Sequence, residues 1–121
     1  MEKTMDLMFP KKTAKKKRRK MHRESILHRK DGTCYLCIAL HGDYRLHKDL
    51  HRHHIFGGSN RSLSEAYGLA VYLCLEHHEF GPEAVHNNAE VAEILHRIGQ
   101  EAFEKTYPDT EFLSLFGKNY L

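Results

Sequence analysis

Cysteine and histidine recur in this sequence in short-spaced groups that could bind metal ions. They are a Cys-x2-Cys pair, a Cys-x2-His-His segment and a separate His-His pair, formed by Cys34 and Cys37, by Cys74, His77 and His78, and by His53 and His54. Thiolates and imidazoles are ligands that zinc prefers, and a neutral imidazole can also accept a proton near pH 7. The set is large enough for two sites, one a closed structural zinc site and the other an open, reactive ion with an imidazole beside it.

Cys34, Cys37, Cys74 and His77 form the predicted structural Zn²⁺ site. Two closely spaced pairs from separate segments suit the tetrahedral geometry of zinc. The alternative is that the cysteines are small buried apolar residues and that His77 lies on a helix surface. Three cysteines with this spacing favour a metal site over a disulfide framework. Because the binding energy of such a site is folding energy, loss of zinc should unfold the domain.

The segments around these residues predict the elements that position them. Tyr44–His54 alternates loosely and predicts a strand or a bent hairpin that ends at the histidine pair. Gly57–Asn60 has the composition of a loop, and Leu69–Leu73 is an apolar run that suits a buried strand. Cys74–Glu79 begins like a helix. A ligand-bearing strand, a loop, a second strand and a helical turn are therefore expected in this order.

The C-terminal part of the chain predicts helices. Asn88 is a suitable N-cap for a long helix over Ala89–Thr106. The apolar stripe of that helix predicts core packing rather than a ligand site, and it consists of Val91, Ile94, Leu95, Ile98, Ala102 and Phe103. Asp109 could cap a final helical turn that ends at Gly117, and Met21–Lys30 could form a short helix. A core of about 85 ordered residues is small, which is a further reason to expect a structural metal.

The positive charge of the chain is concentrated at its N-terminus. The net charge is +3, but residues 1–30 carry twelve Lys or Arg against three acidic residues, and residues 31–121 carry seven against thirteen. Residues 1–20 lack apolar periodicity, so we expect a disordered basic arm before a domain that spans residues 21–121. The arm is either a solvated extension alone or also a DNA-binding segment, and its charge density favours nucleic acid. The arm residues expected to contact DNA are Lys15, Lys16, Lys17, Arg18, Arg19 and Lys20.

Four segments of the sequence resemble those of one nuclease superfamily. They are His53–Arg61 (His-His-Ile-Phe-Gly-Gly-Ser-Asn-Arg), Tyr67–Cys74, His77-His78 and Val85–Asn87. Their order is similar to that of the HNH, or ββα-metal, nucleases, and in particular to a phage group that looks related to the recombination-enhancement nucleases, which also carry a basic N-terminal extension. The resemblance covers residues 30–121. It implies an α+β fold, a small ββα-metal (HNH) domain with a zinc knuckle and added C-terminal helices.

The resemblance implies a role for each histidine of the reactive site. His54 corresponds to the general base, which must be neutral near pH 7 to accept a proton from water. His53 and His78 correspond to ligands of one catalytic divalent ion, Mg²⁺, Mn²⁺ or Zn²⁺, which contacts the scissile phosphate and stabilises the leaving 3′ oxygen. His86 either completes the ligand set of the ion or contacts phosphate, and the alternative is a surface histidine before a helix cap. Because neighbouring helix residues point about 100° apart, His78 can face a cleft while His77 faces the zinc.

The sequence departs from the superfamily between the two histidine segments. The usual asparagine, which braces the loop that orients the base, falls near Gly68, where there is no amide side chain. Asn60 is the candidate catalytic residue that could supply this amide, or it is only a turn residue. Arg61 could contact phosphate or form a surface salt bridge, and His51 could share the strand face of His53. The remaining histidines have no partner pattern and are expected at the surface: His22, His28, His41, His47 and His96.

These expectations together predict an HNH endonuclease that hydrolyses phosphodiester bonds in DNA and leaves a 5′ phosphate. The resemblance also implies a phage or prophage origin and a role in recombination, with a recombinase filament as a partner. The alternatives are a non-catalytic zinc-dependent nucleic-acid-binding module, which has no use for the second histidine set, and, more weakly, a histidine-rich metal buffer. No apolar run reaches the about 18–20 residues of a membrane helix and no signal peptide is recognisable, so we expect no membrane contact and a cytoplasmic location in a bacterial host.

Overall fold

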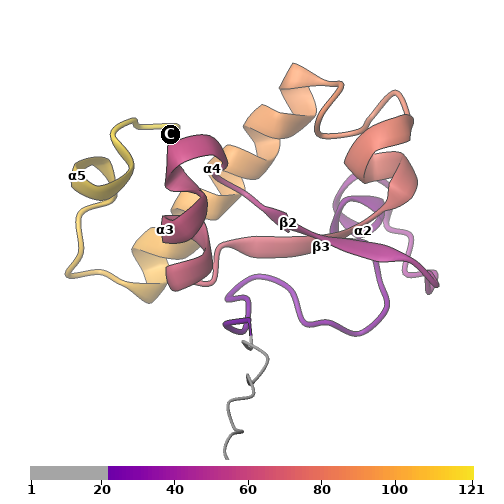
Figure 1. Cartoon of the computed structure of the whole chain (residues 1–121), viewed down its shortest axis with the longest axis horizontal. Helices are drawn as coiled ribbons and strands as arrows, with labels where there is room; N and C mark the ends of the chain where they lie inside the picture. Colours follow the sequence, from indigo (N-terminus) through magenta and orange to yellow (C-terminus); the bar gives the residue numbers. More distant parts are fainter. Residues whose placement is uncertain (1–21) are drawn as a thin grey trace, which may run out of the picture.

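A two-stranded antiparallel sheet lies at the centre of the chain (Figure 1). Strand β2 (Leu50–His54) pairs with β3 (Ala70–Cys74), so that Leu50 lies opposite Cys74 and His54 opposite Ala70. The computed structural model describes residues 22–121. The other elements are α2 (Tyr35–His41), the 3-10 turn η1 (Gly58–Asn60), α3 (Arg61–Ala66), the π-helical turn η2 (Glu76–Phe80), α4 (Ala89–Thr106) and α5 (Phe112–Phe116). The chain is therefore a small α+β protein, as predicted.

Strand β3 is apolar because both of its faces are covered. Four of its five residues are buried, and only Tyr72 is half-buried. The predicted strand over Leu69–Leu73 is thus confirmed, shifted by one residue. All five residues of β2 are half-buried, which leaves its histidines within reach of solvent.

Helix α4 begins and packs as its sequence predicts. The Asn88 side chain accepts hydrogen bonds from the backbone N–H groups of Glu90 and Val91, which caps the helix. The buried residues of α4 include three of the predicted stripe, Val91, Leu95 and Phe103. A glycine in mid-helix lets α4 approach the end of β2: a Cβ on Gly99 would lie 2.9 Å from the Ile55 side chain. The N-cap is therefore confirmed, and the stripe is confirmed in part, since Ile94, Ile98 and Ala102 are only half-buried.

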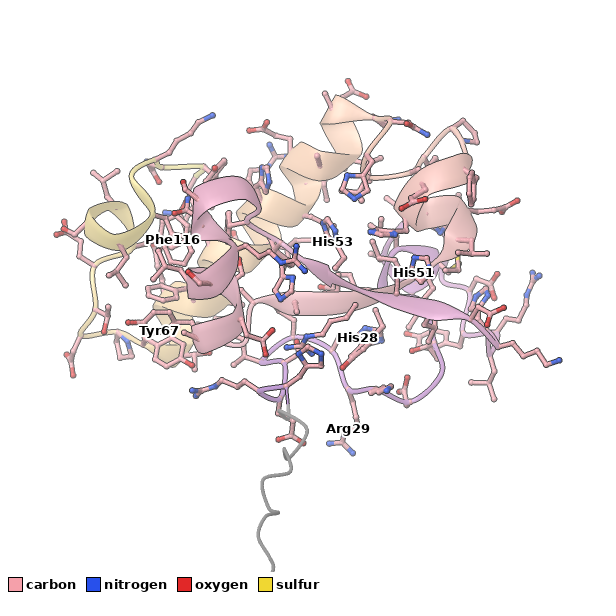
Figure 2. All side chains as sticks on the ribbon, viewed as in Figure 1. His28, Arg29, His51, His53, Tyr67 and Phe116 are labelled. Carbon is pink, nitrogen blue, oxygen red and sulfur yellow. The ribbon has the colours of Figure 1, made fainter. Side chains whose placement is uncertain are left out.

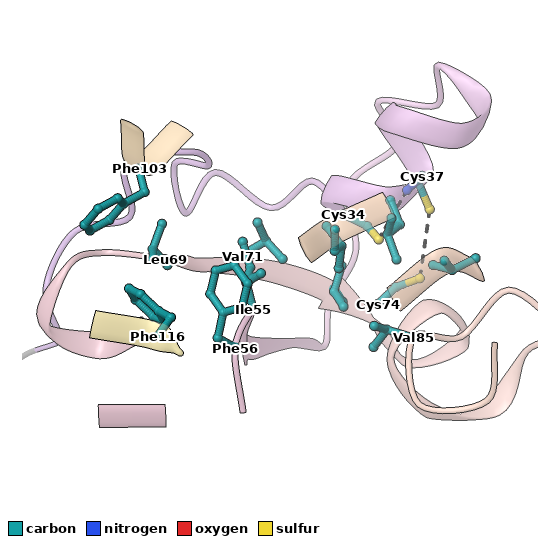
Figure 3. Packing of buried hydrophobic residues seen from close by; sticks show 14 of the residues in the cluster. Cys34, Cys37, Ile55, Phe56, Leu69, Val71, Cys74, Val85, Phe103 and Phe116 are labelled. Atoms are coloured by element: carbon teal, nitrogen blue, oxygen red, sulfur yellow. Dashed lines mark hydrogen bonds between the residues drawn. The ribbon is translucent and has the colours of Figure 1, made fainter. Parts of the chain in front are cut away.

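The core extends from the aromatic residues of the C-terminal helices to the cysteines. Figure 3 shows Phe103 and Phe116 at one end of the buried cluster and the three cysteines at the other, with Val71 and Ile55 between them. Phe56 contacts both Phe112 and Phe116, with ring centroids 5.2 and 5.1 Å apart. The cysteines thus belong to the apolar core as well as to a potential metal site.

Two predicted helical features are wrong. Residues 22–30 form no helix, because they follow the free edge of β3: the backbone N–H of Ile26 donates to the Gly68 carbonyl, and the Ser25 hydroxyl donates to the Ala70 carbonyl. Asp109 caps no helix, because it lies in the turn before Glu111, and Glu111 is the N-cap of α5. The predicted end of α5 at Gly117 is confirmed, since Gly117 adopts a positive φ of 80°.

The expected loop at Gly57–Asn60 is a short 3-10 turn that continues into α3. Helix α3 is held against the sheet by Ser64, whose hydroxyl donates to the Phe56 carbonyl and accepts from the Phe56 N–H. Among residues 22–121, none of the helices is both long and apolar enough to cross a lipid bilayer. The predicted arm, residues 1–20, lies outside the described residues.

Candidate metal centres and active site

The three cysteines and His77 converge on one point. Nδ1 of His77 lies 3.6, 3.4 and 3.5 Å from the sulfur atoms of Cys34, Cys37 and Cys74. The sulfur atoms of Cys37 and Cys74 are 3.9 Å apart. Tetrahedral zinc with bonds of about 2.3 Å to sulfur and about 2.0–2.1 Å to nitrogen holds its ligands about 3.5–3.8 Å apart. The four side chains are therefore close enough together, and spaced correctly, to hold zinc.

Local backbone structure places each of these ligands. Cys34 is the N-cap of α2, and its sulfur accepts from the N–H of Cys37 one turn into the helix. Cys74 is the last residue of β3, and the π-helical turn η2 returns His77 over it. All four residues are buried. The site is thus closed to solvent, as a structural zinc site should be.

Without a bound cation, the surroundings of Cys37 and Cys74 favour neutral thiols. Burial raises the pKa of the Cys37 thiol, and the neighbouring Cys34 and Cys74 raise it further. Burial also raises the pKa of Cys74. A bound cation reverses the preference of the thiols for their protonated form, because a thiol that coordinates a metal is deprotonated. On the outer side, Nε2 of His77 lies 3.3 Å from a carboxylate oxygen of Glu83, the kind of contact that fixes the ring of a metal-ligating histidine.

Three further histidines meet at a second point, outside the cysteine cluster. His53 on β2, His78 on η2 and His86 in the loop before α4 have ring nitrogens within 4.8 Å of one another. Nε2 of His78 lies 3.2 Å from Nε2 of His86. Three neutral imidazoles are a donor set that suits a first-row divalent ion. The structure therefore brings the three predicted ligands of the second ion together.

His53 and His78 favour their neutral forms. Burial lowers the pKa of His53 to about 3, and repulsion from His78, His86 and other histidines contributes to the shift. Burial also lowers the pKa of His78, with His86 and His51 adding to the effect. A neutral imidazole presents a lone pair and can act as a metal ligand. Both side chains are consequently in the protonation state that metal binding needs.

His51 supports His78 from the strand. Nδ1 of His51 lies 2.9 Å from Nδ1 of His78, so one of the two rings donates a hydrogen bond to the other. Figure 2 shows His51 and His53 along β2, two positions apart and therefore on the same face. This contact uses the nitrogen of His78 that does not face His86. His51 can thus fix the orientation of a metal-ligating ring.

His54 turns to the neighbouring helix instead of the histidine cluster. Its Nε2 lies 2.8 Å from Oε1 of Glu65 on α3. The Arg52 guanidinium donates to the same oxygen, and the backbone N–H of Arg23 donates to Oε2. Partial burial raises the pKa of Glu65, but the hydrogen bonds from His54, Arg23 and His22 and the Arg52 charge outweigh this effect and lower the pKa to about 2. Glu65 is therefore an anion throughout the neutral range.

The histidine cluster and His54 line one open cleft of about 480 Å³. Its lining includes the histidine cluster, the base candidate and a cation: His53, His78, His86, His54 and Arg61. His96 on α4 also lines the cleft and stacks on Phe56. The cleft thus combines potential metal ligands, the Glu65-bound imidazole of His54 and a positive charge in one place.

Asn60 lies apart from this arrangement. Its side-chain amide donates to the Phe116 carbonyl, 3.0 Å away, and links the turn after β2 to the end of α5. In this part of the described chain, Gly57, Gly58 and Arg61 line the cleft, whereas Asn60 does not. The arm residues predicted to contact DNA lie outside the described residues.

Three site features were not found by sequence reasoning. Glu65 carries no motif that marks it as a partner of His54. The sequence places His51 on the strand face of His53 but carries no signal for its contact with His78. His28 is buried rather than at the surface, since Nδ1 of its ring accepts from the Tyr72 N–H and Nε2 contacts the Thr33 hydroxyl (Figure 2). The prediction for His28 is wrong, because it ignored pairing of residues 22–30 with β3.

The other expected surface histidines divide into two groups. His22 and His41 are exposed, as predicted. His47 and His96 are half-buried, His47 beside the Cys37 sulfur at 3.7 Å.

Comparison of the chain with family models, with curated proteins and with solved structures finds no match in any of the three.

Proposed function

We propose that this protein is a metal-dependent HNH-type endonuclease that hydrolyses phosphodiester bonds in DNA. The observation that supports the proposal most is that His53, His78 and His86 form a ligand cluster in the same cleft as His54, while a separate cluster of cysteines and His77 can hold zinc. A protein that only needed a structural zinc would have no use for the second cluster. Two ion sites with an imidazole beside one of them suit hydrolysis of a phosphodiester.

The second site has the donor chemistry for a catalytic ion. Its three candidate ligands are imidazoles from β2, η2 and the loop before α4, and all three line the open cleft. Imidazole suits Zn²⁺, whereas Mg²⁺ and Mn²⁺ prefer oxygen ligands, so this set favours Zn²⁺ over the other two candidate ions. When bound, a divalent ion there would supply positive charge to stabilise the phosphate and the leaving 3′ oxygen.

Side chains of the cleft carry out proton transfer and phosphate binding in the proposed reaction. His54 accepts the proton of the attacking water as the new phosphorus–oxygen bond forms and the bond to the 3′ oxygen breaks. Arg61 lines the same cleft and can donate hydrogen bonds to a phosphate oxygen. General-base catalysis of this kind contributes about 10²–10⁴-fold to a rate. His54 should therefore be the residue whose loss reduces cleavage most without loss of fold.

DNA is the proposed substrate because of the charge distribution. Residues 31–121 carry an excess of acidic side chains, so attraction to a polyanion must come from the arm and from bound metal. The phage or prophage origin and the action on a recombinase filament rest on the sequence resemblance alone.

The test is cleavage of supercoiled plasmid by the zinc-loaded protein with Mg²⁺, Mn²⁺ or added Zn²⁺. We expect cleavage with at least one ion, and a loss of about 10²–10⁴-fold in His54→Ala with the zinc content unchanged. Glu101→Ala, an exposed change on α4, is the control and should cut at the parental rate. Cutting by His54→Ala at the parental rate would contradict the assigned mechanism. One tightly bound zinc with no ion-dependent cutting would instead support the non-catalytic nucleic-acid-binding module.

The recombination role has its own measurement. Cleavage of duplex, single-stranded and branched DNA is compared with and without a recombinase filament on the DNA. A role in recombination predicts faster cleavage of filament-bound DNA. Equal activity on naked DNA would remove the recombinase from the proposal and leave the endonuclease unaffected.

A further inference from the structure

The contact between His54 and Glu65 has a consequence for which ring nitrogen of His54 can act as a base. An ionised carboxylate only accepts hydrogen bonds. Since Oε1 of Glu65 lies 2.8 Å from Nε2 of His54, Nε2 must carry the proton of the neutral ring. The lone pair then belongs to Nδ1. Within residues 22–121, the hydrogen bond of the His54 ring goes to Glu65 alone.

We propose that Glu65 is a positioning residue for the cleavage reaction, because it holds His54 in the tautomer that leaves Nδ1 free to accept a proton from water. This inference rests on the proposed function and extends it. After the proton has moved to Nδ1, the ring is a cation, and the adjacent carboxylate stabilises it. Glu65 thereby both selects the tautomer and favours the charged product of the proton transfer.

The surroundings of Glu65 suit a fixed acceptor. Its side chain is 32 % exposed, and its oxygens also accept from Arg52 and from the Arg23 backbone. Arg52 is itself 9 % exposed and donates to the Tyr72 hydroxyl across the sheet. The carboxylate is thus held in place by donors from β2 and from the segment before α2. A free surface carboxylate would lack such restraint.

The backbone around Gly68 is crowded at the point where the resemblance would place an asparagine side chain. The asparagine expected from the resemblance would fall near Gly68, but a Cβ there would lie 2.7 Å from the Glu24 carbonyl oxygen. Gly68 also has a φ of 73°, which disfavours other residues. No side chain fits at this point. Glu65, one turn earlier, reaches His54 instead.

The first test is the tautomer of His54, and it does not depend on cleavage. We would label the histidines of the zinc-loaded protein with ¹⁵N and assign the His54 ring by comparison with His54→Ala. We expect a protonated Nε2 and an unprotonated Nδ1 near pH 8, and a mixture of both tautomers in Glu65→Ala. A protonated Nδ1 in the parental protein would overturn the inference. If the protein cuts no DNA, the proposed function fails, but this readout still decides the tautomer.

The second test is a double-mutant cycle on cleavage. We expect Glu65→Ala to lower kcat about 10–100-fold with little change in KM, as loss of an outer partner of a functional histidine does. In a His54→Ala background the same change should cost less than about twofold, because the group it positions is absent. An equal loss in both backgrounds would mean a merely structural role and would overturn the inference.

Two further variants separate positioning from folding. Glu65→Gln keeps an acceptor for Arg52 and the Arg23 backbone, so it should retain the parental melting temperature and zinc content even if Glu65→Ala does not. It lacks the charge that stabilises the ring cation, so we expect it to cut more slowly than the parent but faster than Glu65→Ala. Glu101→Gln serves as the matched control. Parental activity in Glu65→Gln and Glu65→Ala alike would contradict the inference.

Discussion

Nε2 of His78 lies 3.2 Å from Nε2 of His86, which joins the turn after β3 to the loop before α4. Two imidazole nitrogens bound to one ion at about 2.0–2.1 Å lie about 3–3.4 Å apart. The distance therefore matches a shared ion, and His53 on β2 supplies the third nitrogen. A metal-free pair of neutral imidazoles could form only one hydrogen bond at this contact.

His86→Ala should weaken binding of the second ion by at least about tenfold and leave the structural zinc in place. The reason is that His86 belongs to the histidine cluster and not to the cysteine cluster. Calorimetric titration of the zinc-loaded protein with Mn²⁺ measures the affinity, and His96→Gln is the control, since His96 lines the cleft outside the ligand cluster. Equal Mn²⁺ affinity in His86→Ala and the parent would exclude His86 as a ligand.

His51→Ala should reduce affinity for the same ion about 10–100-fold, although His51 is not among the three ligands. Its ring orients His78 through the 2.9 Å contact between their Nδ1 atoms. We would measure Mn²⁺ affinity in His51→Ala and in His51→Asn, whose shorter amide offers a different hydrogen-bonding group. An affinity that His51→Ala leaves unchanged would show that His78 needs no support from the strand.

Removal of zinc should unfold the protein, whereas removal of the second ion should not. Binding of structural zinc typically contributes about 10–16 kcal/mol, which is as large as the whole stability of a typical domain, about 5–15 kcal/mol. Circular dichroism melts of Cys74→Ser and of chelator-treated protein should show loss of the cooperative transition. His78→Ala is the comparison and should keep a cooperative melt. A cooperative transition that survives complete zinc removal would contradict the structural role.

Gly68→Ala should destabilise the protein by about 2–4 kcal/mol, because it adds a clash to an unfavourable φ. The added Cβ would lie 2.7 Å from the Glu24 carbonyl. Gly42→Ala is the matched control, since Gly42 also has a positive φ, 62°, but open space around it, so it should cost only about 1 kcal/mol. Equal costs in urea unfolding at the two positions would show that the contact with residue 24 contributes nothing.

His28 should make stability depend on pH below its ordinary pKa of 6.5. Burial lowers the pKa of His28 in the folded state, and Asp31 only partly opposes the effect. Above pH 6.5 the ring is neutral in the folded and the unfolded state, so the full free energy of unfolding is present. As the pH falls below 6.5, the unfolded state binds the proton first. The free energy of unfolding therefore decreases until the pH reaches the pKa of the folded state. Urea unfolding between pH 7.5 and 5.5 should show a smaller decline in His28→Gln than in the parent. Parallel declines would rule out this contribution.

The sequence predicted those parts of the fold that depend on neighbouring residues. Asn88 and the apolar stripe after it are local signals, and they gave the limits of α4 correctly. The spacing of the cysteines predicted which side chains come together, because zinc geometry restricts the choice of ligands. Adjacent histidines on η2 also separated to two sites as predicted.

The rest depended on contacts between distant residues. Residues 22–30 have a plausible helical pattern, yet hydrogen bonds to residues 68–72 hold them along β3 in a non-helical conformation. The partner of His54 is Glu65, which lies eleven positions later on α3. This helix was not predicted, since the segment before it has the composition of a loop. Neither fact follows from propensity or spacing, since the first depends on contacts with β3 and the second on the packing of α3 against β2.

His77 and His78 are consecutive residues on the π-helical turn η2, and they belong to different clusters. A single peptide bond therefore connects the structural centre to the proposed reactive one. Because η2 carries residues of both clusters, we expect a metal ion at the cysteine cluster to help fix the position of His78 in the histidine cluster. On the proposed function, a chain without zinc would then lack an assembled reactive site, and zinc supply would control its activity.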